Sequence, residues 1–138
     1  RAGTIRSPIW RGGGTVFGPQ PHDYKTKISK KMKRLARRSV LSFRADNGDI
    51  LVVDEISISS SKTKEFIEFL KILNISGKKV TILVASLSEN LFLSSRNVPN
   101  IYLVEATSAS TYDLLDCEKL LFDKAGLALL NKKLMVSN

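Results

Sequence analysis

The feature that most constrains this chain is the uneven distribution of its charge. Residues 1–44 contain 12 Lys or Arg residues and one acidic residue, Asp23, a formal balance of +11. Residues 45–138 contain 10 basic and 12 acidic residues, a balance of −2, so the net charge of +9 comes from one end of the chain. A strongly basic segment beside a nearly neutral one is typical of a polyanion-binding arm attached to a folded body.

Length and composition limit the class of protein. With 138 residues and 43% hydrophobic content, the chain has enough apolar material for one hydrophobic core. No apolar run approaches the ~20 residues that a membrane-spanning helix requires. The single cysteine, Cys117, excludes an internal disulfide and fits a reducing compartment. Because the chain begins with Arg1 and not with Met, we expect it to be a fragment of a longer protein.

Residues 1–27 have the composition of an extended arm rich in turns. They hold five of the eight glycines and three of the four prolines, which disfavour helix and strand through backbone entropy and missing N–H donors. The large apolar residues of this segment include three aromatic ones, Trp10, Phe17 and Tyr24. We therefore divide the chain into an arm, residues 1–27, and an α/β body, residues 28–138.

A basic amphipathic helix is predicted directly after the arm. Ser29 is a suitable N-cap, and the helical pattern continues to about Arg44. At ~100° per residue the apolar residues share one arc of about 140°: they are Ile28, Met32, Leu35, Ala36, Val40 and Phe43. The opposite arc holds Lys30, Lys31, Lys33, Arg34, Arg37, Arg38 and Arg44. We expect the apolar arc to dock on the body and the basic arc to face outward.

From Ile50 onward, short apolar runs alternate with helical patterns. Strands are predicted at 50–54, 80–85, 101–104 and 120–122, and helices at 62–73, 89–95, 111–115 and 124–134. The run 80–85 is continuous and rich in β-branched residues, as in a strand buried on both faces. Four successive strand–helix units predict the α/β class, with an open, mainly parallel sheet of about four strands and flanking helices.

Residues with catalytic or ligand-binding potential are few. The glycine run 12–14 suggests a phosphate-binding loop, but the preceding strand and the following Lys-Ser/Thr pair are absent. His22 is the only histidine, so a catalytic triad or a histidine-rich metal site would depend on it, and we expect it to be exposed. Cys117 is expected to be a packing residue. Asp54 and Glu55 follow the first strand, where α/β enzymes place catalytic groups, but they lack partners. We predict no enzyme activity, no metal and no cofactor.

The basic helix has three interpretations. A solvated helix usually mixes charge signs, a helix on an acidic membrane needs a free apolar face, and a helix that binds nucleic acid follows phosphates. Only the third also accounts for the basic arm. The aromatic residues of the arm suit either stacking on unpaired bases or packing on the body. A nucleotide-dependent α/β enzyme with a basic tail is the alternative from another class.

Longer motifs occur in a fixed order along the chain. Near the start are Arg-Ser-Pro-Ile-Trp-Arg-Gly-Gly-Gly at 6–14, Val-Phe-Gly-Pro at 16–19, Asp-Tyr at 23–24 and Lys-Lys-Met-Lys-Arg-Leu-Ala at 30–36. Further on are Lys-Thr-Lys at 62–64, Glu-Asn-Leu-Phe-Leu-Ser-Ser-Arg-Asn at 89–97 and Pro-Asn at 99–100. Together they resemble the bacterial-type L-four family of large-subunit ribosomal proteins, up to about Leu134.

The resemblance implies a structural protein that binds large-subunit ribosomal RNA and supports early subunit assembly. Its partners would be that RNA, neighbouring large-subunit proteins and the nascent peptide; it would contact no membrane and would not form a homo-oligomer. It would lie in the large ribosomal subunit in the cytoplasm of a bacterium or, alternatively, in an organelle. The arm would be the returning limb of a loop that helps form the polypeptide exit tunnel. Family members carry a strand, a helix and the outgoing limb before this point, so we expect these to be missing here.

The RNA-binding residues that this resemblance implies lie in three places. In the arm they are Arg1, Arg6, Trp10, Arg11, Gly12, Gly13, Gly14, Lys25 and Lys27. In the basic helix they are Lys30, Lys31, Lys33, Arg34, Arg37 and Arg38. Arg96 is expected to add a contact where a loop opens after a short helix.

Overall fold

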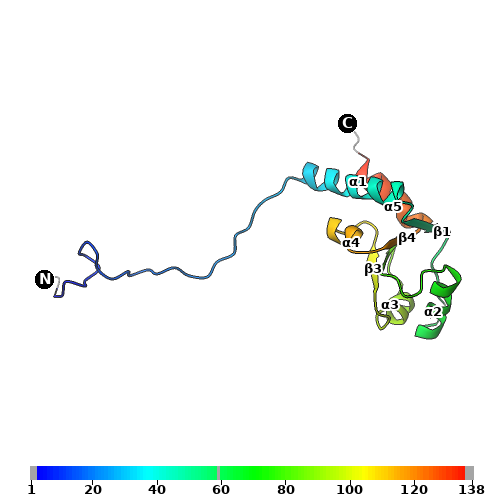
Figure 1. Cartoon of the computed structure of the whole chain (residues 1–138), viewed down its shortest axis with the longest axis horizontal. Helices are drawn as coiled ribbons and strands as arrows, with labels where there is room; N and C mark the ends of the chain where they lie inside the picture. The colour runs from blue at the N-terminus through cyan, green and yellow to red at the C-terminus, as the bar shows by residue number, and fades with distance from the viewer. Residues whose placement is uncertain (1–2, 59, 136–138) are drawn as a thin grey trace.

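The computed structural model describes residues 3–58 and 60–135, which form an α/β body preceded by a long segment without helix or strand (Figure 1). The elements are α1 (Lys30–Asp46), β1 (Ile50–Val53), α2 (Thr63–Ile72), β2 (Val80–Val84), α3 (Glu89–Ser95), β3 (Ile101–Glu105), α4 (Thr111–Leu115), β4 (Lys119–Asp123) and α5 (Lys124–Leu134). The predicted strands and helices of the body are confirmed, each to within two residues at either end.

The four strands form one fully parallel sheet in the order β1-β4-β2-β3. Strand β2 lies inside the sheet, with Ile82 opposite Leu103 of β3 and Leu121 of β4. All five residues of β2 are buried, as its continuous apolar sequence indicates for a strand covered on both faces. The predicted open parallel sheet with flanking helices is therefore confirmed.

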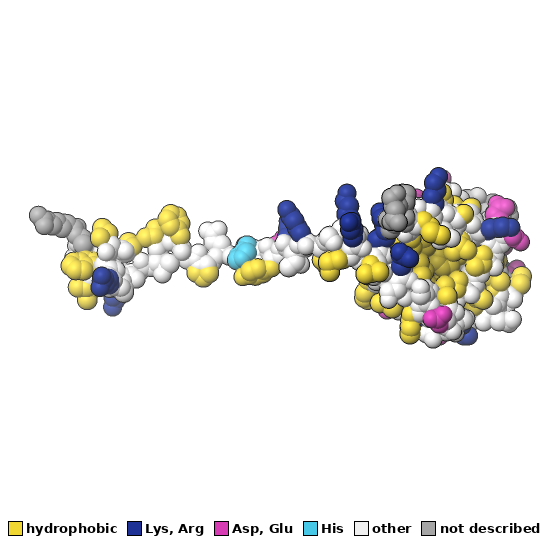
Figure 2. All heavy atoms as spheres, turned by 90° about the horizontal axis from the view of Figure 1, so that it is seen from above, with side chains coloured by type: hydrophobic (Ala, Val, Ile, Leu, Met, Phe, Trp, Pro, Cys, Tyr) yellow, Lys and Arg dark blue, Asp and Glu magenta, His cyan; other side chains and the backbone are white. Residues whose placement is uncertain are grey.

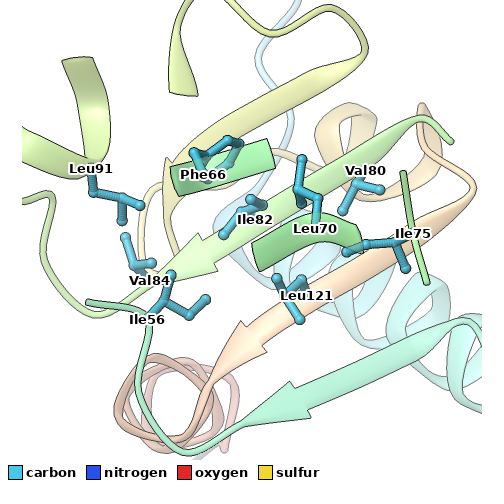
Figure 3. Close-up of a cluster of buried hydrophobic side chains, with 9 residues drawn as sticks. All are labelled: Ile56, Phe66, Leu70, Ile75, Val80, Ile82, Val84, Leu91 and Leu121. Atoms are coloured by element: carbon cyan, nitrogen blue, oxygen red, sulfur yellow. The ribbon is translucent and has the colours of Figure 1, made fainter. Parts of the chain in front are cut away.

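Helices α2 and α3 cover one face of the sheet (Figure 3). Phe66 and Leu70 of α2 and Leu91 of α3 form a buried cluster with Ile82 and Leu121 of the sheet. Each such side chain contributes about 1.5–3 kcal/mol by leaving water. This cluster fixes the two crossover connections that precede β2 and β3.

The second face of the sheet carries α4 and α5. Because side chains alternate along a strand, Leu120 and Phe122 of β4 point away from the first cluster and join Leu83 of β2 in a second one. Leu114 of α4 and Leu130 of α5 complete it. Val40 and Leu41 of helix α1 are partly buried and pack against this cluster, so α1 belongs to the same layer as α4 and α5.

Helix α1 begins where the sequence predicts, because the Ser29 hydroxyl accepts a hydrogen bond from the amide of Met32. The expectation that its apolar arc docks on the body is wrong. Met32, Leu35 and Phe43 are 63%, 65% and 55% exposed. Only Val40, at the edge of this arc, is half-buried, and the other half-buried residues of the helix lie on another face: Arg34, Arg37, Leu41 and Arg44. Leu41 lies within the arc of the predicted basic residues.

Arg44 explains this orientation of α1. Its guanidinium donates hydrogen bonds to the backbone carbonyl oxygens of Leu114 (3.2 Å), Leu115 (2.7 Å) and Cys117. It also pairs with the carboxylate of Asp49 at 3.2 Å. Leu114 and Leu115 end α4, and the last carbonyl groups of a helix have no partner within it. One side chain thus caps α4 and fixes α1, and the assignment of Arg44 to the outward basic arc is wrong.

We expect Arg44→Gln to destabilise the body by about 2–3 kcal/mol, because it leaves three carbonyl groups and a carboxylate without their charged donor. Arg44→Lys should recover little, since one ammonium group lacks the planar fork that serves several acceptors. Urea unfolding measures the free energy. Arg38→Gln, on the exposed side of the same helix, is the control and should change stability by less than about 0.5 kcal/mol. Equal stability of the Arg44 and Arg38 variants would contradict this account of the anchor.

Acid should weaken the same anchor through Asp49. A hydrogen bond from Lys119 at 2.9 Å lowers the pKa of the Asp49 carboxyl below its ordinary 3.8, and the contact with Arg44 acts in the same direction. Because the pKa is lower in the folded state, these contacts stabilise the fold above about pH 4 and are lost as the pH falls through the folded pKa. Asp49→Asn should therefore be less stable than the wild type at neutral pH and lose less stability on acidification. Parallel stability–pH curves for the two proteins would refute this role of Asp49.

Candidate nucleic-acid interface

The arm contains a small closed loop, residues 4–14. Three successive turns in it are held by backbone hydrogen bonds of 3.0–3.1 Å. The amide of Gly14 then donates to the carbonyl oxygen of Arg6 at 2.9 Å and closes the loop. Trp10 lies within these turns and is 58% exposed. The motif that the sequence singles out is therefore locally ordered, although it lies far from the body (Figure 1).

Two positions of the motif require glycine for structural reasons. Gly12 has φ of +75°, a left-handed conformation that side chains with a Cβ rarely adopt. A Cβ on Gly13 would overlap the carbonyl oxygen of Ser7. Gly14 has room for a methyl group, with the nearest atom at 3.5 Å. Gly12 and Gly13 thus serve the closure of the loop, a role that the spacing of the motif does not predict.

The charged and aromatic side chains of the arm point into solvent. Arg6, Arg11, Lys25 and Lys27 are all exposed, whereas Arg1 lies outside the described residues. The aromatic residues are also open: Phe17 is 90% and Tyr24 86% exposed. In this structure, therefore, Phe17 and Tyr24 do not pack on the body.

Helix α1 continues this cationic surface. Lys30, Lys31, Lys33 and Arg38 are exposed, and Arg34 and Arg37 are half-buried. The first acidic residue of the helix is Asp46, at its last position. Figure 2 shows Lys and Arg side chains along the arm and around its junction with the body. The structure thus brings the predicted residues of α1 together next to the arm.

Arg96 does not join this group. It follows α3 as its C-cap residue, and α3 covers the face of the sheet opposite to α1 (Figure 1). An RNA contact of Arg96 would therefore involve a separate surface. Conversely, Lys133 of α5 lies beside α1 but is not among the predicted residues, because only the fold brings it close to α1.

The place where parallel α/β sheets bind ligands is closed by the chain itself. Helices α3 and α5 leave the neighbouring strands β2 and β4 toward opposite faces, which makes the carboxyl ends of these strands the expected ligand crevice. There the carboxylate of Asp123 accepts hydrogen bonds from the amides of Ala85, at 3.0 Å, and Gly126. A Cβ on Gly126 would lie 3.0 Å from the nitrogen of Ala85, so α5 sits directly against this edge.

Other candidate chemical groups have ordinary structural environments. Asp54 is exposed and lies 3.5 Å from the ammonium of Lys124, and His22 is exposed and contacts the ring of Tyr24. Cys117 is buried in the second cluster, as a packing residue. Across residues 3–58 and 60–135, no group of His, Cys, Asp and Glu side chains is arranged to hold a metal ion. None of the helices within those ranges combines the length and apolar character needed to cross a bilayer.

These features define an α/β protein with one extended cationic surface and a closed ligand crevice. The model of the ribosomal protein L4/L1 family matches residues 1–133. The chain therefore belongs to the ribosomal protein L4/L1 family, which confirms the resemblance found in its motifs.

Individual relatives agree with this assignment. The chain is 46% identical over 137 residues to the large ribosomal subunit protein uL4 of Chloroherpeton thalassium, covering 99% of this chain and 65% of that protein. It is 43% identical over 132 residues to uL4 of Amoebophilus asiaticus, with 96% and 63% covered, and 45% identical over 127 residues to uL4 of Onion yellows phytoplasma, with 92% and 61% covered. The chain thus spans a little less than two thirds of the length of these relatives.

The loop 4–14 should depend on Gly13. Gly13→Ala is expected to open the hydrogen bond between the amide of Gly14 and Arg6, because the new Cβ overlaps the backbone of Ser7. The exchange rate of the Gly14 amide, followed by NMR, should rise. Gly18→Ala is the matched control, since a Cβ there meets no atom within 4 Å. Similar Gly14 exchange rates in both variants would contradict this role of Gly13.

Proposed function

We propose that this chain is a structural component of the large ribosomal subunit and binds large-subunit ribosomal RNA through its arm and α1. The observation that carries the proposal is the continuous cationic surface, whose described residues in the arm and α1 are exposed apart from the half-buried Arg34 and Arg37. Membership in a ribosomal protein family supports it, as do the names of the relatives. In this function the protein performs no catalysis.

The physical basis of binding is the release of counterions from RNA phosphates. Each Lys or Arg that neutralises a phosphate frees condensed cations, which makes affinity strongly salt-dependent. Exposed guanidinium groups such as those of Arg6 and Arg11 can contact one phosphate through two hydrogen bonds. Trp10, Phe17 and Tyr24 supply flat faces on which unpaired bases can stack. The contacts offset the entropy that the arm loses when it becomes ordered.

The proposal extends to the place of the arm in the subunit. Residues 15–29, between the closed loop and α1, contain no helix or strand, and a fully extended segment of this length reaches roughly 50 Å. Such a segment can pass between RNA helices and approach the tunnel through which the nascent peptide leaves. In this proposal the protein acts as a single copy, beside neighbouring large-subunit proteins, in a bacterial cytoplasmic ribosome. It joins the RNA early in assembly, before the surrounding RNA closes around the arm.

Two alternatives predict different ligands. A nucleotide-dependent enzyme needs an open crevice at the carboxyl ends of the strands, where Asp123 and Gly126 fill the space between β2 and β4. Binding to an acidic membrane gains one argument from the structure, because the apolar residues Met32 and Leu35 of α1 are exposed beside its cations. We favour RNA because the cationic surface continues along the arm and because the family is ribosomal.

Binding to large-subunit ribosomal RNA should weaken steeply with salt. In the triple variant Lys31→Gln, Lys33→Gln, Arg38→Gln, the negative slope of log affinity against log salt should become less steep by roughly 2–3. Each lost phosphate contact removes about 0.7–0.9 from its magnitude. The control variant Lys64, Lys71 and Lys78→Gln loses the same charge from exposed positions in and after α2, and its slope should stay close to that of the wild type.

Two further measurements on the wild-type chain separate the alternative functions. The wild-type chain should prefer the RNA to vesicles of anionic lipid at equal charge concentration, and adenosine or guanosine triphosphate should not shift its melting temperature. A flat salt response, or equal loss of slope in both triple variants, would contradict the proposed interface. Preferential binding to the vesicles would favour the membrane alternative, and a nucleotide-dependent rise in melting temperature would favour the enzyme.

A further inference from the structure

A second cationic feature lies between α1 and the end of α5. It is an open groove of about 280 Å³ lined by Lys30, Lys33, Arg34, Arg37, Lys133 and Leu134. Five of these six residues are basic and none is acidic. We call it the α1–α5 groove. Typical small-molecule sites are mostly apolar, whereas the basic lining of this groove suits a phosphate group.

The charges of the groove are not neutralised within the described part of the chain. Arg34 and Arg37 are half-buried, and no ion pair joins either of them to a described acidic residue. The carboxyl end of α5 lies at the groove and carries a partial charge of roughly −0.5 from its peptide dipoles. That offsets only a small part of the five positive charges that line the groove, and like charges repel one another. An anion in the groove would relieve this repulsion.

Lys133 is held in a defined position. Its ammonium group donates a hydrogen bond of 2.6 Å to the carbonyl oxygen of Thr107, in the loop between β3 and α4. An ammonium group has three donors, so at least one remains available to a ligand. Leu134, beside it, is 7% exposed and packs in the second cluster. The α5 side of the groove is therefore fixed to the body before any ligand arrives.

We propose that the α1–α5 groove is a phosphate-binding subsite that clamps the RNA backbone between two helices. Lys133 supplies the contact from α5, opposite the cations of α1. The inference rests on the proposed function and deepens it, because it extends the RNA surface from the arm and α1 to the carboxyl end of the chain's last helix. The groove holds the backbone against the rigid body, whereas the arm contacts RNA farther away.

The chain offers a matched pair of variants for the test. Lys133 and Lys132 are neighbours in the last turn of α5 and are both exposed, but only Lys133 lines the groove. Lys133→Gln should weaken binding of the full chain to large-subunit ribosomal RNA by roughly five- to eightfold at 0.1 M salt and lower the salt slope by about 0.7–0.9, the effect of one phosphate contact. Lys132→Gln should leave both quantities unchanged, and Lys133→Arg should retain them.

The outcomes separate this inference from the proposed function. If Lys132→Gln and Lys133→Gln change RNA affinity and salt slope equally, the proposed phosphate-binding role of the groove is overturned, even if both proteins still bind RNA with a steep salt dependence. Loss of salt-dependent binding in every protein, the wild type included, would instead refute the proposed function. Thermal unfolding checks the fold: if Lys133→Gln melts as the wild type does, its weaker binding reflects the lost contact. If it melts at a lower temperature, the Lys133→Arg variant, which keeps the positive charge, is the deciding test. A Lys133→Arg protein that is as stable as the wild type but binds RNA as weakly as Lys133→Gln would overturn the proposed role of the groove.

Discussion

The interaction on which the arrangement of this protein depends is the contact of Arg44 with the end of α4. The guanidinium group holds two carbonyl oxygens of that helix, the carbonyl oxygen of Cys117 and the carboxylate of Asp49. These contacts fix the carboxyl-terminal part of α1 on the second face of the sheet. The first half of α1 then runs along the carboxyl end of α5, and the arm that precedes it extends away from the body into solvent (Figure 1). One half-buried charge thereby determines where the other charges of the basic segment lie.

Sequence periodicity was sufficient for the sheet and its helices, because strand burial and helical spacing are local properties. The apolar run of β2 and the N-cap at Ser29 needed no tertiary information. The orientation of α1 did, because two opposite faces of this helix contain apolar residues. Met32 and Leu35 form the more evident arc, but Val40 and Leu41, together with the hydrogen bonds of Arg44, make the contact with the body.

The residues of the candidate site likewise fall into those that the sequence predicts and those that only the fold identifies. Charge and composition identified the cations of the arm and α1, since an excess of one sign is visible in the chain itself. Lys133 lies about a hundred residues from them in sequence, and only the packing of α5 beside α1 brings it to the same groove. The roles of Gly12 and Gly13 also required coordinates, because backbone overlap with Ser7 cannot be read from spacing. Local turns at Gly13 and a fixed ammonium at Lys133 each reduce the ordering that RNA binding would otherwise require.

RNA that binds the arm and the α1 side of the body should protect the backbone amides of these parts from exchange. Hydrogen exchange along the full chain, measured with and without large-subunit ribosomal RNA, tests it most directly. The account predicts that RNA slows exchange in residues 3–29, in α1 and at the carboxyl end of α5, while α2 and α3 on the opposite face exchange at unchanged rates. Slower exchange confined to α2 and α3, or a stable complex in which the arm exchanges as fast as in the free protein, would contradict it.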